Sequence, residues 1–223
     1  MTHLADTCAP ATFASALVAD VAPCLDARHI HVWWVPYVRR DGRMPLKRVL
    51  AAYLDRSVDA VELTEGTHGR PALATPAELD FNWSHSGDHA MIAVARYLPQ
   101  LGVDIEMQRE RPRARQLAQR FFAATEAEAL GGLPESARSE AFFALWTAKE
   151  AVLKAHGRGL AYGLERVAFE LTPHGTRPKQ FSGPIGAVDE WHCQTLHPQA
   201  DLAGTLAWRG ASRDVSLLRA VSV

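Results

Sequence analysis

The central stretch of the chain, residues 146–160, reads WTAKEAVLKAHGRGL. Its tryptophan, valine and leucine residues recur at the spacing of one helix face, and Gly157 is typical of the residue that ends a helix. The face beside this apolar stripe is predicted to carry three charged residues: Lys149, Glu150 and Lys154. The pattern therefore predicts a helix that places one carboxylate between two ammonium groups.

Such a charged face is often only the solvent-exposed side of a helix. Glu150 and Lys154 stand in the favourable i, i+4 order, which stabilises an isolated helix by about 0.2–0.5 kcal/mol. An earlier stretch favours a functional interpretation. Residues 101–106 form an apolar run in which Asp104 and Glu106 stand two positions apart. In a strand these two carboxylates point to the same face of the sheet.

The composition of the 223-residue chain is that of a globular protein, with 48% hydrophobic and 22% charged residues. Its 24 lysines and arginines against 25 aspartates and glutamates leave a formal charge of −1, which gives no indication of a nucleic-acid-binding protein. The cysteines, Cys8, Cys24 and Cys193, are too far apart to predict a disulfide framework or a zinc site. No apolar run approaches the roughly 20 residues that span a bilayer, and the N-terminus lacks the basic region of a secretory signal. We therefore expect a soluble, cytoplasmic protein that binds neither membrane nor nucleic acid.

Hydrophobic spacing predicts helices and strands in both halves of the chain. Helices are expected over residues 11–21, from 47 to about 58, and from 126 to 130. Strands are expected over residues 29–37, 90–95, 166–171, 191–196, 202–208 and 215–221. Both halves thus combine helix and strands, and no long linker separates them. These features predict an α+β fold of two subdomains, residues 1–103 and 104–223, packed as one body.

Three carboxylates, Asp104, Glu106 and Glu150, form an oxygen-only ligand set that suits Mg²⁺, with Mn²⁺ as an alternative. Ser84 and His85 lie at the polar end of another strand. Together with the lysines of the central helix, these groups are typical of a site that handles a phosphate or pyrophosphate. No nucleophile on the protein is evident, because neither serine of that strand end has a readable base. The attacking group is expected to arrive with a substrate.

Basic residues cluster in two places. Five of them lie between Arg39 and Arg48, where a solvated helix face and a phosphate-binding patch are equally good interpretations. The second cluster runs from Arg109 to Arg120 and carries five arginines against one glutamate. This window is locally basic in a chain that is otherwise balanced in charge.

Four ordered motifs give the chain a resemblance to a known family. They are Gly69-Arg70-Pro71, Phe81-Asn82-Trp83-Ser84-His85-Ser86, Gly102-Val103-Asp104-Ile105-Glu106, and Trp146-Thr147-Ala148-Lys149-Glu150 with its continuation to Leu160. In this order and with these gaps, over roughly residues 30–160, the chain resembles the larger, surfactin-synthetase-associated (Sfp-type) class of 4′-phosphopantetheinyl transferases. These enzymes move the phosphopantetheine arm of coenzyme A onto a serine of a carrier protein.

The resemblance implies a fold of two similar α+β halves packed as a pseudo-dimer, with coenzyme A in the cleft between them. It implies Mg²⁺-dependent transfer to an acyl or peptidyl carrier protein, with release of adenosine 3′,5′-bisphosphate. Carriers of this kind are acidic, so docking is expected near Arg109–Phe122, with Phe121 or Phe122 as an apolar anchor. A monomer is expected, because a fused pair of halves already supplies the cleft. The alternatives are a non-catalytic module that binds coenzyme A or a carrier, and a metal-dependent phosphohydrolase.

The resemblance also assigns roles to single residues. Asp104, Glu106 and Glu150 correspond to its metal ligands, and Glu150 is also the expected base for the incoming serine hydroxyl. His85 and Lys154 correspond to residues that contact the pyrophosphate and complete the catalytic set.

Three further residues are assigned to coenzyme A by the same resemblance. Ser84 corresponds to a phosphate or adenine-side contact, Arg70 to a nucleotide contact and Arg48 to an arginine near the 3′-phosphate. Arg70 replaces a lysine that is common in the family, which keeps the charge but changes the donor geometry. The segment between residues 31 and 47 is shorter than is usual, so that part of the family's basic, nucleotide-binding segment is missing.

Overall fold

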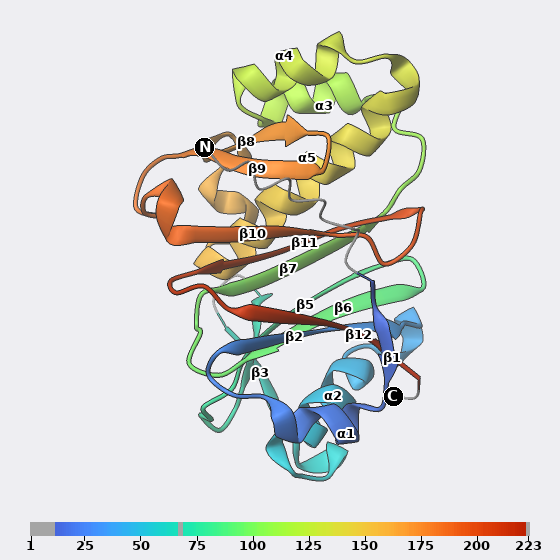
Figure 1. The fold of residues 1–223 in the computed structure, drawn as a ribbon, viewed down its shortest axis with the longest axis vertical. Helices are drawn as coiled ribbons and strands as arrows, with labels where there is room; N and C mark the ends of the chain where they lie inside the picture. The colour runs from blue at the N-terminus through green and yellow to red at the C-terminus, as the bar shows by residue number, and fades with distance from the viewer. Residues whose placement is uncertain (1–11, 67–68, 222–223) are drawn as a thin grey trace, which may run out of the picture.

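A computed structural model describes residues 12–66 and 69–221 of the chain. Figure 1 shows its elements stacked in layers, with two sheets between outer groups of helices. Cys8 and the first residue of the helix expected over residues 11–21 lie outside the described residues. Within the described ranges, no helix combines the length and the apolar character needed to cross a membrane.

The first sheet has five strands in the order β1-β12-β2-β6-β5. Its strands are β1 (Ala14–Ala16), β2 (His29–Pro36), β5 (Asp80–Ser86), β6 (His89–Ala95) and β12 (Asp214–Ala220). One face of this sheet packs against two helices and a short strand pair: α1 (Val18–Val21), α2 (Met44–Leu54), β3 (Leu63–Glu65) and β4 (Pro71–Leu73). Its other face packs against the second sheet.

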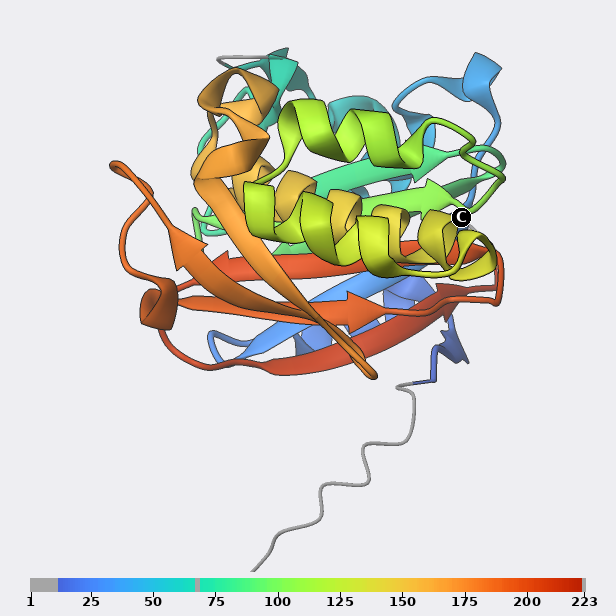
Figure 2. The ribbon, with the colours of Figure 1, turned by 90° about the horizontal axis from the view of Figure 1, so that it is seen from above.

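The second sheet has three antiparallel strands in the order β10-β11-β7. They are β10 (Trp191–Leu196), β11 (Leu202–Arg209) and β7 (Leu101–Met107). The outer face of this sheet carries the long helix α5 (Glu135–His156), and Figure 2 shows the two shorter helices α3 (Ala114–Phe121) and α4 (Ala124–Gly132) lying over it. The hairpin of β8 (Val167–Thr172) and β9 (Gly175–Phe181) packs against the same core.

Strand β7 faces two different environments. Leu101, Val103 and Ile105 are fully buried in the core between the two sheets. Because successive side chains of a strand alternate, Asp104 and Glu106 point to the opposite face, which α5 covers. The pleat of β7 thereby directs both carboxylates toward the helix that carries the third.

The α+β class is confirmed. The strands expected at residues 29–37, 90–95 and 191–196 agree closely with β2, β6 and β10. The helix expected over residues 11–21 is wrong in its first half, where β1 pairs in parallel with β12 from the other end of the chain. The division into residues 1–103 and 104–223 stays a prediction. Strand β7 runs across that boundary, and β12, from the C-terminal part of the chain, lies in the first sheet.

The buried part of β2 contains a polar network around His31, which is 3% exposed. The indole nitrogen of Trp33 donates to the hydroxyl oxygen of Tyr53 at 2.7 Å, and that hydroxyl lies 2.8 Å from Nδ1 of His31. This geometry suits a neutral imidazole whose Nδ1 atom accepts a hydrogen bond from the tyrosine hydroxyl. Burial, followed by the charge of His29, lowers the pKa of His31 from 6.5 to about 4.

We expect the free energy of unfolding to fall as the pH falls from 6.5 to about 4. Between these values the unfolded chain binds a proton that the folded state, with neutral His31, does not. The loss is on the order of 1–3 kcal/mol. Urea denaturation of the wild type and His31→Asn at pH 7 and pH 5 measures it. The variant should show the smaller pH dependence, and an equal dependence in both proteins would contradict the prediction.

Candidate functional site

Helix α5 crosses strand β7 at Gly102, and the two backbones lie close together there. A Cβ atom on Gly102 would stand 2.0 Å from the carbonyl oxygen of Ala151 and 2.6 Å from the amide nitrogen of Ala155. Both neighbours are backbone atoms, which cannot move aside as a flexible side chain would. Glycine therefore lets α5 approach β7 closely enough for side chains of the two elements to meet.

Replacing Gly102 by alanine is expected to destabilise the fold by about 1–3 kcal/mol or more, the usual cost of overpacking a core. The added methyl group must push α5 away from β7. Urea denaturation measures the effect. Gly132→Ala is the control, because a Cβ atom at Gly132 in α4 meets nothing within 4 Å. If both variants unfolded at the same denaturant concentration, close approach at Gly102 would not explain the glycine.

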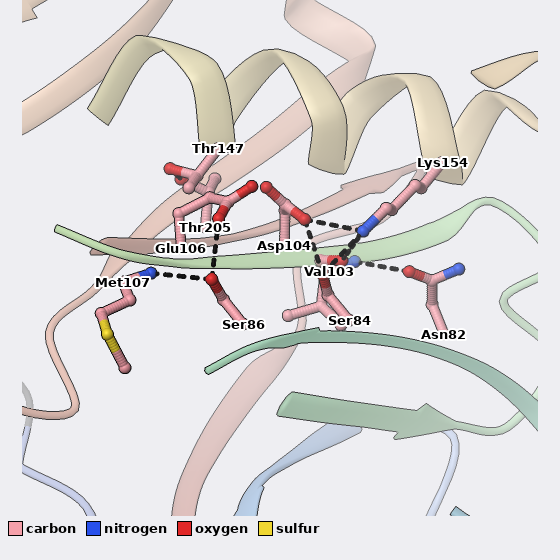
Figure 3. Close-up of polar contacts among 10 residues, drawn as sticks. All are labelled: Asn82, Ser84, Ser86, Val103, Asp104, Glu106, Met107, Thr147, Lys154 and Thr205. Atoms are coloured by element: carbon pink, nitrogen blue, oxygen red, sulfur yellow. Dashed lines mark hydrogen bonds and ion pairs between the residues drawn. The ribbon is translucent and has the colours of Figure 1, made fainter. Parts of the chain in front are cut away.

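Lys154 joins α5 to the acidic strand. Its Nζ atom donates to Oδ1 of Asp104 at 2.7 Å and to Oγ of Ser84 at 2.8 Å. Ser84 in turn donates to the same Oδ1 atom at 2.7 Å, as Figure 3 shows. Asp104 is 3% exposed. Residues from three separate sequence motifs thus meet in one cluster, in which Asp104 and Ser84 are buried and the Lys154 side chain is 26% exposed.

The second carboxylate oxygen of Asp104, Oδ2, is also buried. Among the described residues it has no hydrogen-bond partner. Leaving a buried polar atom unpaired costs about 1–3 kcal/mol, and more for a charged group. Such an atom in a native protein indicates a place for a water molecule, an ion or a ligand.

Two further carboxylates lie near Asp104. Oε2 of Glu106 accepts a hydrogen bond from Oγ of Ser86 at 2.8 Å. Burial, and after it the charge of Asp104, raises the pKa of Glu106, and the same two causes raise the pKa of Glu150 to about 7. The charge of Lys154 acts in the opposite direction on both. The three carboxylates therefore share one electrostatic environment, in which Lys154 contacts Asp104 and acts on Glu106 and Glu150 through its charge.

The donor set fits a divalent cation such as Mg²⁺, because it consists of oxygen atoms and carries excess negative charge. The unpaired Oδ2 atom of Asp104 supports the same fit. Across residues 12–66 and 69–221, however, no three histidine, cysteine, aspartate or glutamate side chains lie close enough together to hold an ion. The assignment of Asp104, Glu106 and Glu150 as metal ligands therefore stays a prediction.

Polar side chains of β5 join the edges of the two sheets along a line that we call the seam. The amide of Val103 donates to Oδ1 of Asn82 at 2.9 Å, and the amide of Met107 donates to Oγ of Ser86 at 3.0 Å. These side chains satisfy amide groups on the edge strand β7 (Figure 3). Sequence reasoning assigned no role to Asn82 or Ser86. Their alternation with apolar residues in β5, at a period of two, is the signal that could have found this polar face.

The remaining assigned residues lie in different surroundings. His85 is exposed and, by strand alternation, lies on the opposite face of β5 from Ser84, with its ring stacked on Tyr37 at 4.4 Å between centroids. Arg48 is an exposed residue of α2. Arg70 uses its guanidinium to contact three backbone carbonyls. The contacts of these residues with a coenzyme stay predictions.

Lys149 does not lie beside Lys154, so the helix-face prediction is wrong in this respect. Its ammonium group is fully buried and lies 2.6 Å from Oε2 of Glu126. It also donates to the carbonyl oxygens of Leu164 at 2.9 Å and Val167 at 2.6 Å. Each residue along a helix turns by about 100°, which directs this lysine into the core while the next residue faces β7.

The arginines of the segment after β7 differ in their exposure and in their contacts. Arg111 lies over the rings of Phe142 and Phe143, at 5.9 and 5.6 Å from their centroids, so it is not part of an open basic surface. Phe122 is 5% exposed and stacks on Phe142. Its suggested use as an apolar anchor is therefore wrong. Phe121 is 38% exposed and remains accessible.

Comparison with known proteins places part of this chain beside one family. Residues 100–207 match the family model described as the 4′-phosphopantetheinyl transferase superfamily. These residues include β7, α3 to α5 and most of the second sheet. The matched region thus contains all three carboxylates and Lys154.

Curated relatives carry the same description. The chain is 35% identical over 172 residues to the 4′-phosphopantetheinyl transferase HetI of Nostoc sp., a match that spans 76% of this chain and 69% of that protein. It is 37% identical over 161 residues to a Synechocystis sp. protein provisionally named as the same enzyme, spanning 71% of this chain and 64% of that protein. It is also 38% identical over 112 residues to the 4′-phosphopantetheinyl transferase psf-1 of Bacillus pumilus, spanning 50% of this chain and 46% of that protein.

Proposed function

The chain belongs to the 4′-phosphopantetheinyl transferase superfamily, and we propose that it transfers the 4′-phosphopantetheine arm of coenzyme A to a serine of an acyl or peptidyl carrier protein. The observation that carries this proposal is the hydrogen-bonded cluster of Lys154, Ser84 and Asp104, in which Oδ2 of Asp104 has no partner among the described residues. Phosphoryl transfer depends on charged groups that are already in place when negative charge shifts in the transition state. This cluster supplies such groups at the crossing of α5 and β7.

In the proposed reaction the hydroxyl oxygen of the carrier serine attacks the phosphorus next to pantetheine. A P–O bond to the serine forms, and the P–O bond to the nucleotide phosphate breaks, with its electron pair leaving on adenosine 3′,5′-bisphosphate. Glu150 takes up the serine proton, directly or through water, and its pKa, raised to about 7, suits a base. Lys154 and His85 stabilise the charge on the pyrophosphate. Ser84 supports the phosphate, and Arg48 the 3′-phosphate.

We propose that Asp104, Glu106 and Glu150 hold Mg²⁺, with Mn²⁺ as the alternative. Bound there, the ion would neutralise charge on the pyrophosphate oxygens. The oxygen-only donor set and the unpaired Oδ2 atom support this assignment.

We also propose that the protein belongs to the larger, Sfp-type class, acts as a monomer and works in the cytoplasm.

Intact-mass spectrometry of an apo carrier protein tests the proposed function. The carrier is incubated with this protein and coenzyme A, once with Mg²⁺ and once with a chelator. We expect the mass of one phosphopantetheine to be added only when metal is present. Release of adenosine 3′,5′-bisphosphate from coenzyme A without any carrier would instead identify a phosphohydrolase. Binding of coenzyme A with neither product, across several carrier types, would identify a non-catalytic module.

We propose that an acidic carrier docks on the exposed arginines that follow β7: Arg109, Arg113, Arg115 and Arg120. Phe121 lies among them and offers an apolar contact. Reversing the charge of Arg113 and Arg115 to glutamate is expected to raise KM for the carrier roughly tenfold at low salt, and less at high salt, because exposed charges are screened. Arg28→Glu, at an arginine whose side chain is 83% exposed before β2, is the control. Unchanged kinetics at low salt would exclude this surface.

A further inference from the structure

Arg70 makes contacts that a coenzyme-binding role does not explain. Its Nη1 atom donates to the carbonyl oxygen of Lys154 at 2.8 Å. Its Nη2 atom donates to the carbonyl oxygens of Phe81 at 3.2 Å and Leu101 at 3.1 Å. These carbonyls belong to α5, β5 and β7. One side chain from the loop before β4 thus contacts the helix and both strands that build the candidate site.

Each of these carbonyl oxygens lies at the end of a helix or at the edge of a sheet. The carbonyl oxygen of Lys154 accepts a hydrogen bond from the amide of Gly157 at 3.2 Å and has a second lone pair for Arg70. It belongs to the last turn of α5, whose carbonyl groups receive no bond from a following turn. They also carry partial negative charge, which a cation such as Arg70 stabilises. Phe81 and Leu101 lie on β5 and β7, the strands that form the edges of their sheets at the seam. Arg70 therefore satisfies a helix end and two sheet edges together.

The residue that Arg70 contacts on α5 is the one whose side chain enters the site. The backbone carbonyl of Lys154 is bonded to Arg70, while its ammonium group is bonded to Asp104 and Ser84. Leu101, the contact on β7, directly precedes Gly102, the glycine at which the backbones of α5 and β7 lie close together. The Arg70 contacts thus lie at the crossing that brings the helix to the acidic strand.

We propose that Arg70 is a positioning residue for the transfer reaction: it holds the last turn of α5 against the seam and so places the Lys154 ammonium group on Asp104 and Ser84. The kinetic consequence of this role rests on the proposed function, whereas the contact itself does not. The role differs from the nucleotide contact that the resemblance assigns to this position.

The substitution Arg70→Lys distinguishes the positioning role from a nucleotide contact. It would keep the positive charge that a nucleotide phosphate needs. The single nitrogen of lysine cannot reproduce the two amino groups by which the arginine contacts three carbonyls on three elements. Arg70→Lys therefore tests the geometry at constant charge, and Arg70→Met removes both charge and geometry.

Arg138→Met is the matched control for these variants. Arg138 also donates to two backbone carbonyls, those of Leu130 at 3.3 Å and Leu133 at 2.9 Å, but it lies near the beginning of α5. Its loss should lower stability without changing kcat of the folded protein. Any general effect of removing an arginine–carbonyl contact is thereby measured separately.

We expect both Arg70 variants to lower kcat by roughly 10- to 100-fold, the effect of a small misplacement of a group that contacts the reacting phosphate. Their affinity for adenosine 3′,5′-bisphosphate, measured by calorimetry, should stay within about twofold of the wild type. Hydrogen exchange should speed up at the amide of Gly157, which donates to Leu153 and Lys154 in the last turn of α5.

The proposal is overturned if Arg70→Lys keeps wild-type kcat and wild-type exchange at Gly157. It is also overturned if Arg70→Met loses affinity for the bisphosphate at unchanged kcat, since that result identifies a nucleotide contact. If the wild type modifies no carrier, the proposed function fails instead. The exchange measurement at Gly157 still tests the positioning contact in that case, because it requires no activity.

Discussion

Replacing Glu150 by glutamine is expected to lower the rate of transfer by roughly 10²- to 10⁴-fold, the contribution of a typical general base. Glutamine keeps the size of the side chain, but it can neither take up the serine proton nor act as an anionic ligand. Steady-state assays with saturating coenzyme A, carrier and Mg²⁺ measure the change in kcat. Near-normal turnover would exclude Glu150 as the base.

The same replacement is expected to stabilise the protein in the absence of metal at pH 8. Burial and the charge of Asp104 raise the pKa of Glu150 from 4.5 to about 7 in the folded state. The folded chain therefore binds the proton more tightly than the unfolded chain, and the free energy of unfolding falls as the pH rises through this range. The effect is on the order of 1–3 kcal/mol, and the glutamine variant does not carry this cost.

Urea denaturation at pH 8 with a chelator measures this stabilisation. The control is Glu140→Gln, at an exposed glutamate of the same helix, which should change neither activity nor stability. Lower activity together with higher stability would separate a role in the reaction from a general loss of structure. A Glu150→Gln variant less stable than the wild type would contradict the cost assigned to the buried Glu150 charge beside Asp104.

Replacing Lys149 by methionine is expected to destabilise the protein by about 3–5 kcal/mol, because one partner of a buried ion pair is then left without its counter-charge. The Oε1 and Oε2 atoms of Glu126 accept hydrogen bonds from the amides of Phe169 and Ala123, both at 2.8 Å, so the carboxylate is held in place. The carbonyls of Leu164 and Val167 would lose their donor as well. Thermal and urea denaturation measure the loss.

The double variant Lys149→Met, Glu126→Leu is the matched test of that explanation. Replacing both partners of a buried pair by apolar residues is often far less costly than removing one. We therefore expect the double variant to recover part of the stability that the single variant loses. Equal destabilisation in both proteins would mean that the ion pair is not the cause.

Several features of the site follow from local backbone geometry and could be predicted from the sequence. Alternation along a strand predicts that Asp104 and Glu106 share a face, and helical spacing predicts that Glu150 and Lys154 lie one turn apart. The α+β class follows from the same two periodicities. In the structure the strand face and the helix meet, with Lys154 bonded to Asp104 at 2.7 Å.

Other features depend on partners that are distant in the chain, and local patterns do not contain them. Residues 14–16 have a spacing that suits a helix, yet they form strand β1 because they pair with β12. Lys149 is charged and was predicted to lie on the functional face, yet Glu126 and two carbonyls on neighbouring elements hold it in the core. The sequence showed Gly102 only as part of a motif, whereas its closeness to Ala151 explains why glycine is required.

The order and spacing of the motifs show which residues are chemically able to act together: three carboxylates, a lysine and a serine. The same local patterns turn these residues to one face of a strand or helix. Which of them meet depends on the folded chain, where Arg70 contacts a carbonyl 84 positions away in the sequence. Side-chain periodicity is a property of the local backbone, whereas hydrogen bonds, burial and close packing depend on elements that come together only when the chain folds.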